Sequence, residues 1–185
     1  MTFLKSSVRL ATAALLLALA STSLADEPAK SDAPGQGRGP MGRGRGQDSE
    51  FAKDRDTFHY LLTNHQDVQR TVKNLDNGVE TVTESDKPEV AKRIQEHVPA
   101  MYKRLQSGQG VRYWDPLFAE AFQHGKKMSM EITNTERGVK VVETATDPAV
   151  VEIIQAHAEV VSKFAAHGFE EARKEHPVPV EDAKK

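Results

Sequence analysis

The stretch PEVAKRIQEH at residues 88–97 returns sixty positions later as PAVVEIIQAH at residues 148–157. The copy extends to both sides without a gap, so that residues 58–108 match residues 118–168. These two segments share twelve identities in fifty-one positions, against about three expected from average residue usage. The chain is therefore predicted to contain an internal duplication, which decides how its fold is interpreted.

Each copy is expected to contain a helix, a β-hairpin and a second helix. Apolar side chains spaced three or four residues apart predict the first helix of each copy; they are Phe58, Leu61, Leu62, His65 and Val68, then Phe118, Ala121 and Phe122. Strands are expected at residues 70–75 and 79–84, and again at 128–135 and 139–144. Gly78 and Gly138 can take the positive φ that closes a short hairpin. The second helices are expected near residues 87–107 and 147–167, each ending at a glycine.

A single domain over residues 51–176 fits this pattern best. Two domains of half that length, without disulfides, would each be marginally stable. We therefore predict an α+β fold in which two pseudo-symmetric repeats share one four-stranded antiparallel sheet with helices packed on it.

The ends of the chain have a different composition. Lys5 and Arg9 precede an apolar run, and the small residues Ser23 and Ala25 follow it. This is the layout of a secretory signal peptide over residues 1–25, cleaved after Ala25. Residues 26–50, rich in Gly, Arg and Pro, are expected to form a disordered linker, and residues 177–185 a flexible tail. The mature protein is thus predicted to be periplasmic or secreted, with no transmembrane segment.

Composition and motifs limit the possible functions. The chain has no cysteine, which excludes disulfides, thiolate metal sites and thioether-linked haem. Its 25 basic and 27 acidic residues give a net charge of −2, and this disfavours a nucleic-acid partner. It contains no Gly-x-Ser-x-Gly, no glycine-rich phosphate loop and no His-Glu-x-x-His. We therefore lean away from an enzyme.

Two histidines occupy the same position in the two copies. On a helical wheel, His97 and His157 fall within the apolar stripes of the second helices. A buried imidazole without a partner costs about 1–3 kcal/mol, so each needs a hydrogen-bond partner, a metal or a ligand. Facing one another, they could hold copper or zinc, or bind haem b iron from both sides, with Met101 one turn from His97. His65 or His59 could supply a further metal ligand.

Other interpretations of these residues remain open. A histidine on an apolar face more often bonds a backbone carbonyl or a carboxylate. Gln95 and Gln155 could orient a histidine ligand, although glutamines at such positions are more often exposed. Our leading hypothesis is an exported, non-catalytic binding protein for a metal ion or haem. The alternative is a structural or protein-interaction module without a cofactor, and an enzyme using His as acid or base is a third possibility.

A resemblance rests on several segments: ETATDP at 143–148, VV at 150–151, IQAHA at 154–158 and VV at 160–161, together with DPLF at 115–118 and HPVP at 176–179. In these segments the chain resembles a family of exported bacterial proteins with a duplicated Asp-Pro-x-Val-Val-x-x-Ile-Gln-x-His repeat. The resemblance covers nearly the whole domain. It implies export and one recurring domain, and it assigns no activity or catalytic residue.

Overall fold

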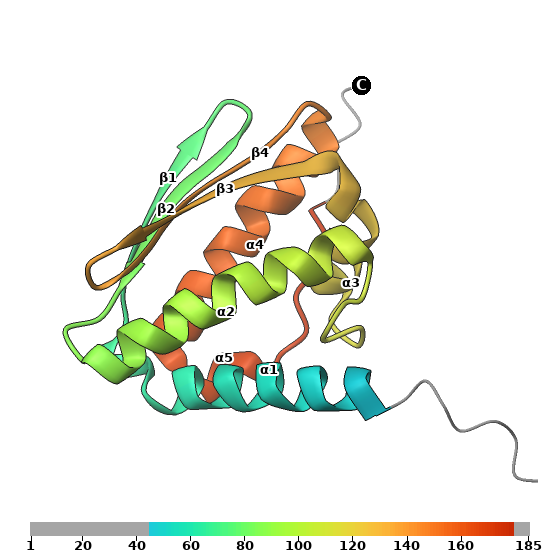
Figure 1. Cartoon of the computed structure of the whole chain (residues 1–185). Coiled ribbons are helices and arrows are strands. Elements are labelled where there is room, and N and C mark those ends of the chain that lie inside the picture. Colours follow the sequence, from blue (N-terminus) through green and yellow to red (C-terminus); the bar gives the residue numbers. More distant parts are fainter. Residues whose placement is uncertain (1–44, 180–185) are drawn as a thin grey trace, which may run out of the picture. The chain divides into compact units, whose positions relative to one another are not determined.

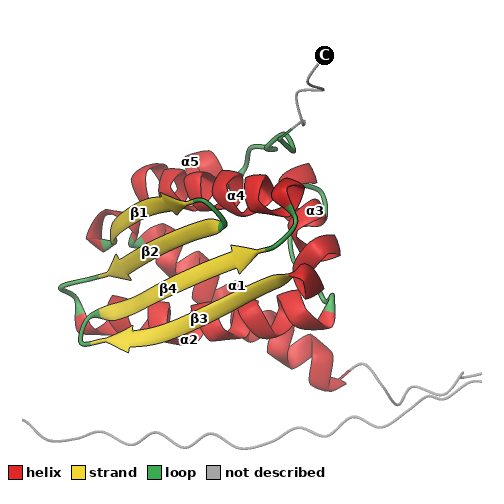
Figure 2. Ribbon diagram, turned by 90° about the horizontal axis from the view of Figure 1, so that it is seen from above, coloured by secondary structure: helices red, strands yellow, loops and turns green. Residues whose placement is uncertain are grey.

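Two antiparallel hairpins form one four-stranded sheet (Figure 2). Its strands are β1 (Gln69–Leu75), β2 (Gly78–Glu84), β3 (Met128–Thr135) and β4 (Gly138–Ala145). Their order is β1-β2-β4-β3, so that β2 and β4 pair at the centre, and every neighbouring pair is antiparallel. This computed structural model describes residues 45–179. The predicted α+β class and four-stranded antiparallel sheet are confirmed.

The helices cover one face of this sheet (Figures 1 and 2). They are α1 (Arg45–Thr63), α2 (Pro88–Ser107), α3 (Pro116–His124), α4 (Pro148–His167) and α5 (Phe169–Ala172), with single 3-10 turns η1 (His65–Asp67) and η2 (Gly125–Lys127). Both α2 and α4 begin with proline in the first turn, where its missing N–H is no loss. Gly108 ends α2 in the left-handed conformation, with φ 67°.

The long helices cross between the hairpins. α2 packs chiefly on β4 and β3, whereas α4 packs on β1 and β2. Gln95 Nε2 donates to the carbonyls of Thr135 and Gly138, at 3.0 and 3.2 Å. Gln155 Nε2 donates in the same way to Leu75 and Gly78, at 3.0 and 3.3 Å. The two glutamines therefore fasten each helix to the turn of the hairpin from the other half.

The packing of the helices leaves space over the middle of the sheet. α2 packs against α1, and α4 against α3, but α2 and α4 have little direct contact. The buried core lies where helix and sheet meet, and its most enclosed side chains are Val79, Val90, Leu117, Val139, Val150 and Ile154. Burying an aliphatic side chain of this size stabilises the fold by about 1.5–3 kcal/mol.

Gly78 and Gly138 have a different role from the predicted one. A Cβ atom on Gly78 would overlap the carbonyl oxygen of Glu143, and one on Gly138 would overlap that of Thr83. Gly78 has φ 157°, but Gly138 is not among the positive-φ residues of the described chain. The turn prediction is therefore wrong for Gly138. Both glycines instead allow the close approach of the central strands β2 and β4.

The first helix also differs from the prediction. It begins at Arg45, inside the segment expected to be a linker, and ends at Thr63. His65 therefore lies in η1 and Val68 just before β1, and neither lies on the face of α1. The predicted signal peptide 1–25, linker residues 26–44 and tail residues 180–185 lie outside the described residues. Within residues 45–179, no helix has the length and apolarity needed to cross a membrane.

Candidate functional site: a cavity between α2 and α4

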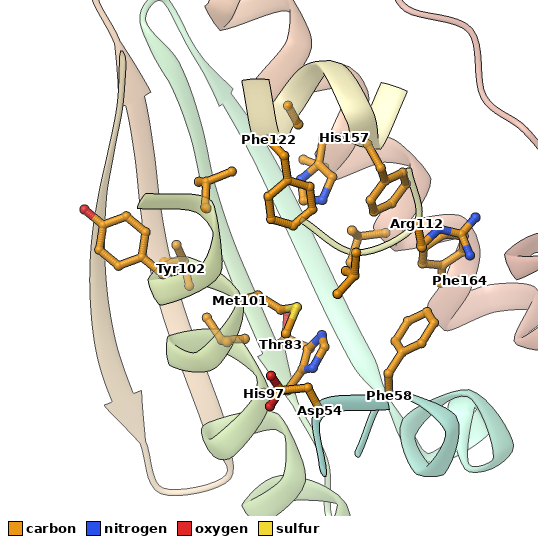
Figure 3. A pocket seen from close by; sticks show the side chains of 18 of the residues that line it. Asp54, Phe58, Thr83, His97, Met101, Tyr102, Arg112, Phe122, His157 and Phe164 are labelled. Carbon is orange, nitrogen blue, oxygen red and sulfur yellow. The ribbon is translucent and has the colours of Figure 1, made fainter. Parts of the chain in front are cut away.

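The space between α2 and α4 is a cavity of about 510 Å³ (Figure 3). The inner face of the sheet forms its floor, with Thr81 and Val141 paired near the centre. Met101 of α2, Phe58 of α1 and Phe122 of α3 contribute to its walls. Most lining side chains are aliphatic or aromatic. Small-molecule sites typically measure about 300–1,000 Å³, so the cavity can hold a ligand of that class.

Exposed lining residues mark where the cavity opens. Phe51 of α1 is 47% exposed and Trp114, before α3, is 51% exposed, although both line the cavity. Arg173, just after α5, is also exposed and lines it. The mouth therefore lies among these segments.

His97 and His157 face the cavity from α2 and α4 (Figure 3). His97 stacks on Phe58, with ring centroids 5.9 Å apart, and His157 meets the edge of Phe118 at 5.1 Å. The rings lie at separate places along the cavity. The repeated histidines thus each pack on a repeated phenylalanine, and both are available to a ligand.

Both histidines are neutral near pH 7. Burial lowers the pKa of His97 to about 4, although nearby Asp54 raises it. Burial, followed by the charge of Arg70, lowers the pKa of His157 to about 4. His97 Nδ1 is buried without a hydrogen-bond partner, and neither ring nitrogen of His157 has one among residues 45–179. A neutral imidazole can donate from one nitrogen and accept, or bind a metal, at the other.

Arg70 and Glu143 bring charge into this apolar space. Arg70 extends from β1 and donates to Thr83 Oγ1 at 2.5 Å. Its Nε is buried and has no partner in the described part of the chain. Burial lowers the pKa of Arg70 to about 10, so it remains a cation at neutral pH. Burial raises the pKa of Glu143, on β4, to about 7, although Arg70 lowers it.

We did not predict Arg70 or Glu143 as site residues. A signal was present, because alternation along a strand sends every second side chain to the same face. Arg70 and Glu143 share the inner face with Thr81, and this register follows from the sequence once the central pairing of β2 and β4 is known. The sequence pattern does not give the strand order, and it is this order that places Arg70 and Glu143 in the same sheet.

The structure brings only some of the predicted ligands together. His97, His157, Met101 and the exposed His59 line the cavity. His65 is not among the lining residues, and its Nδ1 lies 3.0 Å from the carbonyl oxygen of Ala165. Across residues 45–179, no group of three or more His, Cys, Asp or Glu could hold a metal ion.

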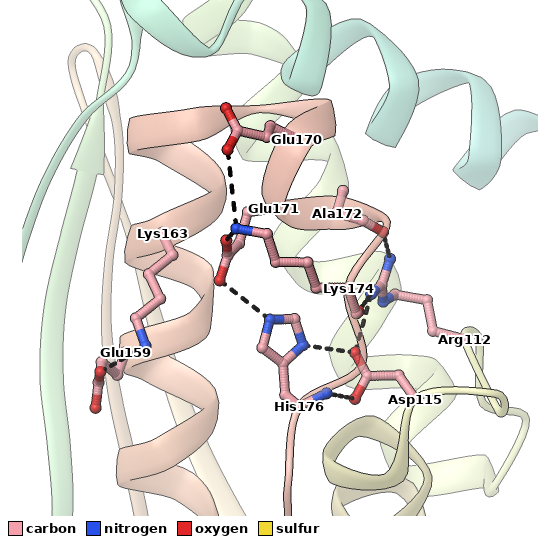
Figure 4. A network of polar contacts seen from close by, with 9 residues as sticks. All are labelled: Arg112, Asp115, Glu159, Lys163, Glu170, Glu171, Ala172, Lys174 and His176. Atoms are coloured by element: carbon pink, nitrogen blue, oxygen red, sulfur yellow. Dashed lines mark hydrogen bonds and ion pairs between the residues drawn. The ribbon is translucent and has the colours of Figure 1, made fainter.

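A second polar cluster joins Arg112, Asp115, Glu171 and His176 (Figure 4); we call it the clamp. It shares Arg112 with the lining of the cavity. Asp115 is fully buried; its Oδ2 accepts from Arg112 at 2.9 Å and lies 2.7 Å from His176 Nδ1. His176 Nε2 lies 3.3 Å from Glu171. Burial raises the pKa of Asp115, but hydrogen bonds from His176 and Arg112 outweigh it and hold that pKa below its usual value. The clamp fixes the segment after α5 to the start of α3.

The sequence analysis predicted that the domain ends at His176 and predicted no role for this residue. The segments DPLF at 115–118 and HPVP at 176–179 were used only as parts of a resemblance. In the fold they are in direct contact, since Leu117 N also donates to the His176 carbonyl at 3.1 Å.

Comparisons with known protein families, with characterised proteins and with solved structures gave no significant match. The resemblance to exported bacterial proteins therefore stays a prediction, and the function is argued from the cavity.

Proposed function

We propose that this protein is a non-catalytic binding protein that takes haem, or another small and mainly apolar molecule, into the cavity between α2 and α4. The observation that carries the proposal is that His97 and His157, at equivalent positions of the two copies, both line one apolar cavity. Among the described residues neither has a hydrogen-bond partner at the ring nitrogens. Each such imidazole costs about 1–3 kcal/mol, and a ligand that bonds it recovers this free energy.

We also infer that the two halves are related by an approximate twofold axis. Thr81 pairs with Val141, sixty residues away, at the middle of the β2–β4 register. Hydrogen bonds recur at the same offset, since Ser85 N donates to Arg137 at 2.9 Å and Ala145 N donates to Asn77 at 3.0 Å. The axis accounts for the equivalent placement of the two histidines on α2 and α4.

Haem suits this cavity better than a bare metal ion, because either histidine alone could hold it. Zn²⁺ or Cu²⁺ usually takes three or four protein ligands, and within the described range no cluster of three acidic or histidine side chains fits an ion. Haem supplies four nitrogens of its own and requires only axial ligands. Met101, which lines the same space, is a further candidate for an axial position.

A haem titration followed by absorption spectroscopy tests this proposal. The expected result is saturable binding with a Soret shift, weakened at least tenfold in His97→Ala, His157→Ala protein. His124→Ala is the matched control, because His124 bonds Glu120 at 2.9 Å and does not line the cavity. If haem fails to bind, a polarity-sensitive dye such as 1-anilinonaphthalene-8-sulfonate tests for another apolar ligand. If neither probe enters the cavity, the proposal is rejected.

Export is part of the proposal and rests on residues 1–25. Mass spectrometry of the protein isolated from its own cells should give a mature chain that begins at Asp26. A chain that retains Met1 would contradict export by a cleaved signal peptide.

A protein-interaction module is a second candidate, which one surface feature favours. Phe51, Tyr113 and Trp114 are large aromatic residues that are 47%, 61% and 51% exposed, and aromatic side chains are enriched in protein interfaces. Cross-linking in intact cells, compared between wild type and Tyr113→Ser, tests this candidate without changing a residue that lines the cavity.

A further inference from the structure

We infer that the ligand is an apolar organic acid whose carboxylate pairs with Arg70 in the cavity. This inference rests on the proposed ligand-binding function and names the chemical class of the ligand.

Arg70 lines the cavity and has unused hydrogen-bonding capacity. A guanidinium carries five N–H donors in a planar fork that matches a carboxylate. In the described part of the chain, the hydrogen bond of the Arg70 side chain is the one to Thr83 Oγ1, at 2.5 Å. Its Nε is buried with no partner. A ligand oxygen would therefore meet donors that no described residue engages.

The charge of Arg70 is also poorly compensated. Glu143 is the acidic side chain that acts on it electrostatically, but the two form no ion pair within 4.0 Å among residues 45–179. Because burial raises the pKa of Glu143 to about 7, much of this carboxyl group is neutral near pH 7. The other acidic group inside the lining, Asp54, is taken by Arg104 at 2.6 Å. An uncompensated buried cation costs several kcal/mol, and an anionic ligand would remove that cost.

The two halves of the sheet differ at this position. The residue sixty places after Arg70 is Met130, which also lines the cavity. Met130 pairs with Glu143 across β3 and β4, whereas Arg70 pairs with Thr83 across β1 and β2. The duplication thus carries a cation in one half and a thioether in the other. A ligand with one acidic end and one apolar end fits this polarity.

A carboxylate fits better than a phosphate. A phosphate would bring close to two negative charges to the Arg70 guanidinium with Glu143 nearby, whereas a carboxylate brings one and is bound bidentately by arginine. The apolar walls around Phe58, Phe118 and Phe122 then receive the remainder of the molecule.

Isothermal titration calorimetry with decanoate and decan-1-ol tests the inference, because these probes share a chain and differ in the acid group. Charge-assisted hydrogen bonds favour the acid, and we expect wild-type protein to bind decanoate about 10- to 100-fold more tightly than decan-1-ol. Arg70→Met, which copies Met130, should reduce decanoate affinity to that of the alcohol and leave the alcohol unchanged. Lys73→Met is the matched control, since Lys73 lies on the same strand, is exposed and does not line the cavity.

The outcomes separate this inference from the proposed function. Equal binding of acid and alcohol by wild-type protein overturns the acid assignment and leaves a binding cavity. Circular dichroism shows whether the Arg70→Met protein folds. If it folds and still prefers the acid, the role of Arg70 is overturned. If Arg70→Met does not fold, the test uses the Arg70→Gln variant instead. The inference then requires that wild-type protein prefers decanoate over decan-1-ol and that Arg70→Gln loses this preference. If decanoate, decan-1-ol, haem and the dye all fail to bind, both proposals are rejected.

Discussion

The cavity and the clamp bury the same kinds of side chain but differ in how far these are hydrogen-bonded. In the clamp, Asp115 accepts hydrogen bonds from Arg112 and His176, and Arg112 also donates to the Ala172 carbonyl at 2.7 Å, although its Nε is buried without a partner among the described residues. In the cavity, Arg70 has a buried nitrogen without a partner, as does His97 within the described residues. Hydrogen-bonded polar groups hold elements together, whereas buried groups without partners weaken the fold. The clamp joins two segments through a carboxylate that several donors share, and the charged and imidazole groups of the cavity make few such bonds; this difference separates a structural cluster from a candidate ligand site.

The largest change in the free energy of unfolding is expected from a substitution in the clamp. Asp115→Ala should lower the free energy of unfolding by about 3–5 kcal/mol, because it leaves Arg112 and His176 buried without their carboxylate. Urea unfolding followed by circular dichroism measures this loss. A loss below about 1 kcal/mol would mean that the clamp is not structural, and the comparison would fail.

Removing the carboxylate of Glu143 from the cavity should raise the free energy of unfolding, whereas removing that of Asp115 lowers it. Glu143→Gln copies the neutral form and should raise the free energy of unfolding at pH 8 by about 2–3 kcal/mol. Burial raises the folded pKa of Glu143 to about 7 from 4.5. The stability that the wild-type protein has with neutral Glu143 is therefore fully present below pH 4.5 and is lost as the pH rises through 7. The gain should therefore vanish at pH 4.5. A variant less stable than wild type at pH 8 would show that Glu143 has a stabilising partner.

The histidines should control stability on the acid side. Burial lowers the folded pKa of His97 and of His157 to about 4 from 6.5, so stability present above pH 6.5 is lost as the pH falls through 4. His97→Leu, His157→Leu protein should lack this loss and exceed wild type by about 1–2 kcal/mol per histidine at pH 5. Thermal unfolding from pH 7 to 4 measures the slope. Parallel profiles for the two proteins would contradict neutral, buried imidazoles.

The smallest effect tests the equivalence of the two halves. Gln95→Ala and Gln155→Ala should each lower the free energy of unfolding by about 1 kcal/mol, since each removes the same pair of bonds to a hairpin turn. Lys73→Met, on the exposed side of β1, serves as the reference for a surface change. A marked loss in only one glutamine variant would break the proposed twofold relation.

The sequence predicted the elements of this fold well, because they depend on local spacing. The expected helices near 87–107 and 147–167 lie within one residue of α2 and α4, and the hairpins stand where glycine and strand patterns placed them. The strand order could not be read, since pairing of β2 with β4 joins residues about sixty positions apart. The end of α1 was also predicted wrongly, because residues with helical spacing continue past the end of this helix to His65, which lies in η1.

The lining of the candidate site was predicted in part. Helical spacing correctly placed His97 and His157 inward, and Met101 and His59 also line the cavity. Arg70 and Glu143 were missed because their strands come together only through the central pairing. His176 was missed because its partners, Asp115 and Glu171, meet it through tertiary packing. Neighbours distant in sequence cannot be inferred from periodicity alone.

The central claim is that the groups without partners in the cavity meet a ligand, whereas the saturated groups elsewhere do not. The most direct measurement follows the ring nitrogens of the histidines by NMR during addition of decanoate. We predict that the signals of His97 and His157 shift with saturation, while those of His65 and His124, which are hydrogen-bonded away from the cavity, stay in place. Saturable binding that leaves His97 and His157 unchanged would contradict the claim and move the ligand to another part of the molecule.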